Sequence, residues 1–155
     1  MAFLSSINII GSGLTAQQLR LDVVSENITN STTTRTENDG GAYRRKMVVF
    51  EAQSGRESFR SAMAKAAGKA VANRGNGANA GGVRVTQIVD DPSPLKLVYD
   101  PTHPDANEEG YVEMPNVDTV KEITDAMAAT QAYSANVTAF NTLKSVIAKG
   151  LEIGG

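Results

Sequence analysis

Residues 123–151 read ITDAMAATQAYSANVTAFNTLKSVIAKGL and carry the clearest structural pattern in the chain. Its larger side chains recur at steps of three and four residues, which average to the coiled-coil period of about 3.5. The stretch therefore predicts a long helix whose seam packs against another helix. The seam consists of Ile123, Met127, Thr130, Tyr133, Val137, Phe140, Leu143, Ile147 and Leu151.

A second seam of the same kind lies near the N-terminus. Gln17 takes one of its positions, and the apolar members are Ile7, Ile10, Leu14, Leu21, Val24 and Ile28. We therefore expect long N- and C-terminal helices that pack as a coiled-coil-like pair. A self-contained two-helix core within one subunit is the simpler alternative. Two helices alone form a thin rod with little interior, which favours further coverage by neighbouring chains.

Between the helices the sequence predicts a small β-rich insert, which makes the fold class α+β. The segment 61–82, rich in Ala and Gly, has few large apolar side chains and is predicted to be a mobile loop. The chain then divides into an N-terminal helix with its motif at 1–36, the insert at 37–115 and a C-terminal helix at 116–155. Strand patterns separated by turn signals occur at Tyr43–Phe50, Val83–Val89, Leu95–Tyr99 and Tyr111–Met114.

Capping residues indicate where the two helices begin and end. Ser5 and Ser6 can cap the first helix, which then runs to about Asn27 or Asn30. Asn116 or Asp118 can cap the C-terminal helix in the same way.

Two glycines, Gly11 and Gly13, lie inside the first helix. Each costs the helix about 1 kcal/mol relative to alanine. They indicate either a close approach between helices or a first turn that forms only in an assembly. We favour the second interpretation.

Composition excludes several classes of function for these 155 residues. The 15 Lys and Arg are outnumbered by 17 Asp and Glu, so the basic surplus that a phosphate backbone demands is missing and nucleic acid is not an expected partner. The chain has no cysteine, which excludes disulfides, thiolate zinc sites and cysteine nucleophiles.

The N-terminal segment MAFLSSINII lacks a basic region and a small-residue cleavage site, so it does not resemble a cleaved signal peptide. No apolar run approaches the roughly 20 residues needed to cross a bilayer, so no membrane insertion is expected. These features predict a cytoplasmic protein or one exported without a cleaved signal.

One acidic cluster could in principle bind a metal or perform acid–base chemistry: Asp100, His103, Asp105, Glu108 and Glu109. Its spacing matches neither an EF-hand nor a pair of histidines on one helix face. Prolines among acidic residues are typical of a solvated loop. We therefore expect no catalytic site, no metal and no cofactor.

Three basic residues in succession, Arg44, Arg45 and Lys46, open the first predicted strand. Charges at a strand edge discourage unwanted pairing with other strands. We interpret the run as a solvated edge.

The motifs point to a known family. Residues 12–30, SGLTAQQLRLDVVSENITN, resemble the N-terminal signature of bacterial flagellar rod and hook proteins, with Asn27 and Asn30 at the core of the motif. Within that family, residues 99–118, YDPTHPDANEEGYVEMPNVD, are similar to proximal rod proteins, as are the shorter stretches 81–85 and 90–94. The C-terminal AYSAN at 132–136 and LEIG at 151–154 complete the resemblance.

The resemblance implies a non-enzymatic subunit of the flagellar basal body, exported unfolded through the flagellar type III apparatus. Its implied partners are other copies of itself and other rod proteins, with the rod-to-membrane-ring adaptor and the surrounding ring as further candidates. Subunit packing would use the N-terminal seam, while the C-terminal helix would contribute Ile123, Met127, Tyr133, Asn136, Val137, Phe140, Leu143, Ile147 and Leu151.

We expect the terminal segments to be poorly ordered in a free chain and to fold on joining the rod. Two rival functions remain open: a soluble coiled-coil adaptor or export chaperone, and a small hydrolase that uses His103.

Overall fold

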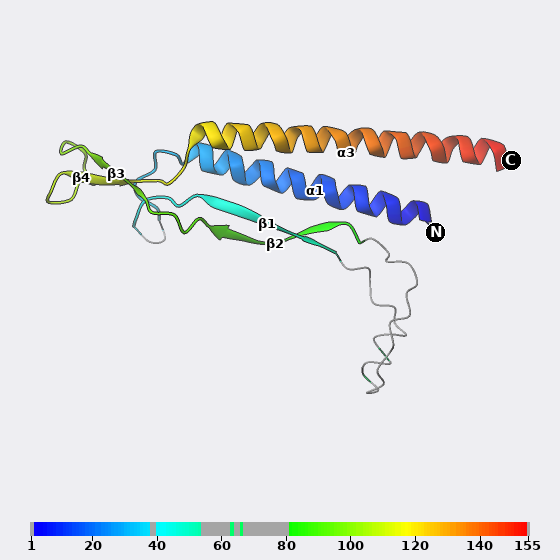
Figure 1. Ribbon diagram of the computed structural model, residues 1–155, viewed down its shortest axis with the longest axis horizontal. Helices are drawn as coiled ribbons and strands as arrows, with labels where there is room; N and C mark the ends of the chain where they lie inside the picture. The colour runs from blue at the N-terminus through cyan, green and yellow to red at the C-terminus, as the bar shows by residue number, and fades with distance from the viewer. Residues whose placement is uncertain (1, 38–39, 54–62, 64–65, 67–80, 155) are drawn as a thin grey trace.

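The computed structural model describes residues 2–37, 40–53, 63, 66 and 81–154. These residues form two long helices with two antiparallel strand pairs between them in sequence, so the predicted α+β class is confirmed (Figure 1). In chain order the elements are α1 (Ala2–Thr29), β1 (Lys46–Ala52), β2 (Val83–Asp90), β3 (Lys96–Tyr99), β4 (Tyr111–Met114) and α3 (Thr119–Gly154). The predicted mobile loop at 61–82 lies outside the described residues apart from positions 63, 66, 81 and 82.

The molecule is elongated, with α1 lying between α3 and the β1–β2 ribbon (Figure 1). The two helices run antiparallel, so the end of α1 lies beside the start of α3. The β3–β4 hairpin lies at one end of the molecule and the C-terminus of α3 at the other. None of the described helices combines the length and the apolar character that a membrane crossing requires.

The helix ends follow their capping chemistry only in part. Asp118 caps α3, because its Oδ1 accepts the backbone N–H of Val120 at 3.1 Å and of Lys121 at 3.4 Å. Helix α1 begins at Ala2, so Ser5 and Ser6 lie inside the helix and the predicted cap there is wrong.

Strand β1 begins at Lys46 and pairs with β2, with an irregularity between Val49 and Phe50. It starts three residues later than predicted because the backbone N–H of Tyr43 bonds the carbonyl of Thr33, just after α1, instead of a strand. Strand β4 matches the predicted range, and β3 begins one residue late.

For Gly13 the structure supports the other interpretation, a close approach between helices. Helix α1 is continuous through this residue, and a Cβ placed there would lie 3.0 Å from Nδ2 of Asn136 on α3. Gly13 therefore permits close approach of the two helices. A Cβ at Gly11 would meet nothing within 4 Å, so close packing does not explain that glycine.

The β1–β2 ribbon also contacts α1 at the start of β2, through Ser12. The Oγ of Ser12 donates to the carbonyl of Ile9 and accepts the backbone N–H of Val83 at 3.1 Å. Gly82 passes directly over this hydroxyl with a φ of +83°, a conformation that favours glycine.

The buried core is small and lies mostly where the end of α1, the start of α3 and the approach to β1 meet. Two buried residues in it are polar, Asn27 and Glu122, and both are fully enclosed. The buried apolar residues are Ala16, Val23, Val24, Tyr43, Val112, Val117 and Ala129. So small a core leaves much of the apolar surface of the helices in solvent.

A candidate subunit-packing surface and the polar junction behind it

The side chain of Asn27 connects three elements. Its Nδ2 donates to the carbonyl of Lys46 and to Oε2 of Glu122, both at 2.9 Å. Its Oδ1 accepts the backbone N–H of Lys46 and the hydroxyl of Tyr43, also at 2.9 Å. Because a fully buried amide must satisfy its donors and acceptor, Asn27 fixes β1 and α3 in one position against α1.

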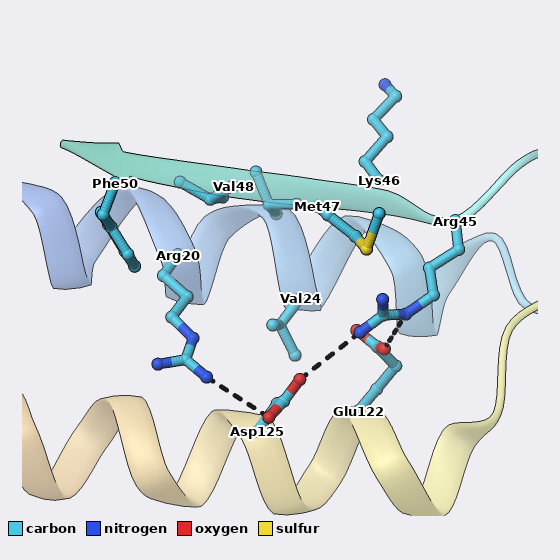
Figure 2. A pocket seen from close by; sticks show the side chains of 10 residues that line it. Arg20, Val24, Arg45, Lys46, Met47, Val48, Phe50, Glu122 and Asp125 are labelled. Carbon is cyan, nitrogen blue, oxygen red and sulfur yellow. Dashed lines mark hydrogen bonds and ion pairs between the residues drawn. The ribbon is translucent and has the colours of Figure 1, made fainter. Parts of the chain in front are cut away.

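Arg45 extends this junction toward α3 and β2. Its Nε donates to Oε1 of Glu122 at 2.6 Å, and its two terminal nitrogens lie 3.4 Å from Asp125 and 3.5 Å from Asp91. Arg20 of α1 pairs with the other oxygen of Asp125 at 3.3 Å. Figure 2 shows the Arg45 and Arg20 side chains converging on the carboxylates of α3, Arg45 from the segment just before β1 and Arg20 from α1. We call Asn27, Arg45, Glu122 and Asp125 the polar junction.

Electrostatics keep Arg45 and the neighbouring Tyr43 protonated near neutral pH. Burial alone would lower the pKa of Arg45, but the hydrogen bond and charge of Glu122 raise it above its ordinary value. Burial and the nearby charge of Glu26 raise the pKa of the Tyr43 hydroxyl. Tyr43 therefore stays a donor to Asn27 across the physiological range.

A groove of about 360 Å³ opens between β1 and α3, with α1 behind it (Figure 2). One part of its lining is apolar, from Val24, Val48 and Phe50, and the other part is the ion-paired face of Arg45 and Asp125. The charged groups at this face already pair with one another, so the groove resembles a packing interface more than a reactive site.

The contact between the helices uses small and polar residues at heptad spacing. On α1 these are Gly13, Arg20 and Asn27, and on α3 they are Glu122, Ala129 and Asn136. Ala129 has no exposed surface. This face differs from both predicted seams.

The predicted N-terminal seam lies along one side of α1 and is mostly half-buried. Val24 is buried, while the rest are intermediate: Ile7, Ile10, Leu14, Leu21 and Ile28. The motif residue Asn30 ends the helix, with its Nδ2 bonded to the carbonyl of Glu26 at 3.0 Å.

The predicted C-terminal seam begins on the side of α3 that faces away from α1. Met127 is 69% exposed, and Ile123, Val137, Phe140 and Leu151 are also exposed. Thr130 is exposed as well, and the remaining members are intermediate in burial: Tyr133, Leu143 and Ile147. Asn136, also predicted to take part in subunit packing, lies against Gly13 of α1. Together with Val120, the exposed members Ile123, Met127, Val137, Phe140 and Leu151 form what we call the outer stripe.

Helical geometry explains why one chain cannot cover the outer stripe. A seam with a seven-residue period drifts by about 20° per heptad around a straight helix. The face turned to α1 carries Glu122, whereas the seam begins at Ile123, about 100° further round the helix. Helix α1 therefore does not bury the start of this seam.

The acidic loop after β3 uses its polar groups to hold its own shape. Asp100 accepts the backbone N–H and hydroxyl of Thr102, which lower the pKa of the carboxyl. The Nδ1 of His103 accepts the backbone N–H of Asp105 at 3.1 Å. Asp105 accepts the Thr34 hydroxyl at 2.8 Å and pairs with Arg35, so it ties the loop to the segment after α1. The described residues contain no cluster of three potential metal ligands.

The interpretation of the basic run as a solvated edge is wrong for Arg45. Its side chain is 13% exposed and makes the ion pairs described above, whereas Arg44 is exposed. Neighbouring side chains in an extended chain point to opposite sides, so Arg45 is largely buried while Arg44 points into solvent. Neither Glu122 nor Asp125 was predicted from the sequence to be a functional residue. Their charges lie on the same helix face as Ala129, and this combination is a usable signal for a helix contact.

Two models of known protein families match the terminal parts of the chain. The chain matches the family described as "Flagella basal body rod protein" over residues 7–35 and "Flagellar basal body rod FlgEFG protein C-terminal" over residues 108–153. These ranges cover most of α1 and α3 together with β4.

Curated relatives match along almost the entire chain. It is 48% identical to the flagellar basal-body rod protein FlgC of Bacillus subtilis (strain 168), over 99% of each chain. The chain belongs to the FlgC family of flagellar basal-body rod proteins. It is 43% identical to FlgC of Borreliella burgdorferi, over 99% of this chain and 98% of the relative, and 40% identical to FlgC of Escherichia coli O157:H7, over 99% of each. The resemblance inferred from the motifs is confirmed.

Proposed function

We propose that the chain is a structural, non-catalytic subunit of the proximal rod of the bacterial flagellar basal body. It assembles through α1 and α3 into a helical tubular shaft that transmits torque. The observation that carries this proposal is the outer stripe of α3, a set of apolar side chains that the described part of the chain leaves exposed. The location in the basal body is supported by the family, whose members are flagellar basal-body rod proteins.

The energetics favour coverage by another helix. Fully burying one Leu, Ile or Phe side chain contributes about 1.5–3 kcal/mol. Residues such as Ile123, Met127 and Phe140 are only partly covered by the chain itself, so most of this gain is available to an assembly. The gain offsets the entropy of ordering the far ends of both helices, which in our proposal occurs on joining the rod.

The shape of the chain suits an open assembly. One surface along α3 that contacts a different surface on the next copy produces a heterologous interface, which extends into a helix when the rotation does not close. The proposed partners are other copies and other rod proteins, with the adaptor and the surrounding ring as further candidates. The proposed location is the rod where it spans the periplasm. Nucleic acid and membrane insertion have no part in it.

The polar groups that could do chemistry are occupied by the fold, which supports a non-catalytic role. His103 serves its own loop, and the charges of Arg45 and Asp125 pair at the junction. The polar junction fixes the angle between the β1–β2 ribbon and the helices. A subunit that transmits torque requires such a fixed angle.

Replacing Met127 by Asp tests the proposal. Met127 is largely exposed, so the change leaves the fold of the free chain intact but places a charge in the stripe. Ala128→Asp is the matched control, because Ala128 is also exposed and points about 100° away. In motile cells we expect Met127→Asp to abolish rod growth and swimming while Ala128→Asp retains both. Normal swimming with Met127→Asp would refute the proposed packing.

A further inference from the structure

Two of the stretches that resemble rod proteins meet at the start of β2. Residues 12–30 open with Ser12 on α1, and residues 81–85 lead into β2. The Oγ of Ser12 accepts the backbone N–H of Val83 at 3.1 Å, although the two residues are 71 positions apart. The polar junction contacts the opposite end of the β1–β2 ribbon, so it does not account for Ser12.

The backbone at Gly82 has room for glycine alone. A Cβ there would lie 2.2 Å from the Oγ of Ser12 and 3.3 Å from the Cα of Ile9, and the φ angle is +83°. Gly82 also holds the end of the ribbon together, since its carbonyl accepts the backbone N–H of Gln53 at 2.9 Å. The ribbon therefore lies directly on α1 at this point. We call Ser12, Gly82 and Val83 the clasp.

The clasp depends on the helical state of α1. The hydroxyl of Ser12 donates to the carbonyl of Ile9 at 2.7 Å, a contact that one turn of helix creates. This bond orients the hydroxyl so that its oxygen accepts the N–H of Val83. Without the helical turn from Ile9 to Ser12, the oriented oxygen and the surface beneath Gly82 are both lost. A docked ribbon therefore requires a formed helix.

Helix α1 is intrinsically weak at the same point. Gly11 and Gly13 flank Ser12, and glycine is the least favourable helix residue after proline. Residues 2–19 carry no charged side chain, so side-chain ion pairs do not support this half of the helix. The contacts at this level include Gly13 against Asn136 of α3 and Ser12 against the ribbon. Order in this half of α1 therefore depends on contacts with other elements.

We propose that the clasp couples the folding of the first half of α1 to the position of the ribbon. It closes when α1 becomes helical through Ile9 on joining the rod, and the β1–β2 ribbon is then fixed at both ends. This inference rests on the proposed function, in which the far ends of the helices order on assembly. A subunit that enters the rod thereby converts the order of its N-terminal helix into a fixed position of its ribbon.

The size of the contact sets the direction of the coupling. One hydrogen bond between neutral groups changes an equilibrium by about twofold to tenfold. The bond between Ser12 and Val83 is only part-buried, so it does not keep a weak helix folded by itself. Neighbouring chains order α1, and the clasp follows.

Ser12→Cys combined with Gly82→Cys reports whether the clasp is closed. A Cβ at Gly82 would lie 3.2 Å from the Cβ of Ser12, close to the separation of about 3.5–4.5 Å in a disulfide. Oxidation of this otherwise cysteine-free chain with copper phenanthroline is followed in the purified free chain and in purified rods. We expect the crosslink to form about tenfold faster in rods, because only the closed clasp holds the two thiols within disulfide distance. Equal rates in the two states, or no crosslink in rods, would overturn the coupling.

Gly11→Cys combined with Gly82→Cys is the matched control. Gly11 precedes Ser12 but points about 100° away around the helix, and a Cβ there would meet nothing within 4 Å. This pair shares the strain of a cysteine at position 82 and should crosslink at one slow rate in both states. A control crosslink in rods as fast as that of the first pair would contradict a specific contact at Ser12.

Ser12→Ala tests the clasp without strain at position 82. Thr15→Ala is its control, because both hydroxyls donate to a carbonyl of their own helix but only Ser12 accepts an N–H from the ribbon. In purified rods, Ser12→Ala should speed hydrogen exchange of the Val83 amide by about twofold to tenfold, whereas Thr15→Ala should leave it unchanged. Unchanged exchange at Val83 in Ser12→Ala rods would overturn the clasp.

The outcomes separate this inference from the proposed function. Swimming cells whose rods contain the chain, but show neither the crosslink between positions 12 and 82 nor an effect of Ser12→Ala, would refute the clasp and leave the structural role intact. Absence of the unmodified chain from purified rods would refute both.

Discussion

Replacing Asn27 by alanine should cost more stability than any other change to the family motif. The substitution removes four hydrogen bonds at once and leaves the Tyr43 hydroxyl, the Lys46 amide and one oxygen of Glu122 without their partner. Each buried group left unsatisfied costs about 1–3 kcal/mol, and water entering the space recovers part of the loss. We expect the free energy of unfolding to fall by about 3–5 kcal/mol, a large fraction of the total for a domain.

Urea denaturation of the purified chain, followed by circular dichroism, measures this loss. Asn30→Ala is the control, because Asn30 makes only local bonds to Glu26 and Thr33 at the end of α1. It should cost about 1 kcal/mol. A loss below 1 kcal/mol for Asn27→Ala, or equal losses for the two variants, would refute the role of Asn27 in joining α1, β1 and α3.

Two further predictions concern acid stability and the helix contact. Hydrogen bonds from Ser93 and the charge of Arg45 lower the pKa of Asp91. The ionised carboxylate therefore contributes to the free energy of unfolding above the ordinary pKa of 3.8, and this contribution is lost as the pH falls further. Asp91→Asn should make the free energy of unfolding decline less steeply with falling pH, as measured by unfolding curves in acid. If Asp91→Asn left the decline unchanged, the carboxylate would not contribute. Gly11→Ala should raise the free energy of unfolding by about 1 kcal/mol because the site is open, whereas Gly13→Leu should lower it by about 1–3 kcal/mol by forcing the helices apart. Equal effects of the two changes in urea denaturation would argue against a close contact at Gly13.

The sequence predicts the helices well because their apolar periodicity extends over many turns. The start of α3 and the range of β4 follow from local signals at Asp118 and Pro115. The start of β1 does not, because Tyr43 is held by the carbonyl of Thr33 and the amide of Asn27, which are tertiary contacts. Local propensity carries no information about such partners.

The packing faces were harder to predict than the helices. Size and hydrophobicity favour Ile123 and Met127 as the helix contact, yet the chain places Glu122 and Ala129 there. Small and paired polar residues permit a close approach between helices, and this leaves the larger side chains for other surfaces. The sequence pattern shows that a seam exists, but not which of two partners covers it.

Arg45 illustrates the same limit at the level of one residue. Three basic residues in a row have the same composition as a solvated edge, and only the pairing with Glu122 and Asp91 distinguishes Arg45 from Arg44. Those partners lie far away in sequence, so the junction became visible only once the fold was known.

The most direct test of the account measures whether the outer stripe becomes covered on assembly. Met127→Cys introduces a single thiol into the cysteine-free chain, and its reaction rate with a maleimide is compared between the free chain and purified rods. We predict rapid labelling of the free chain and at least tenfold slower labelling in rods, since a neighbouring helix then excludes the reagent. Equal labelling rates in the two states would contradict the claim that other chains bury this face of α3.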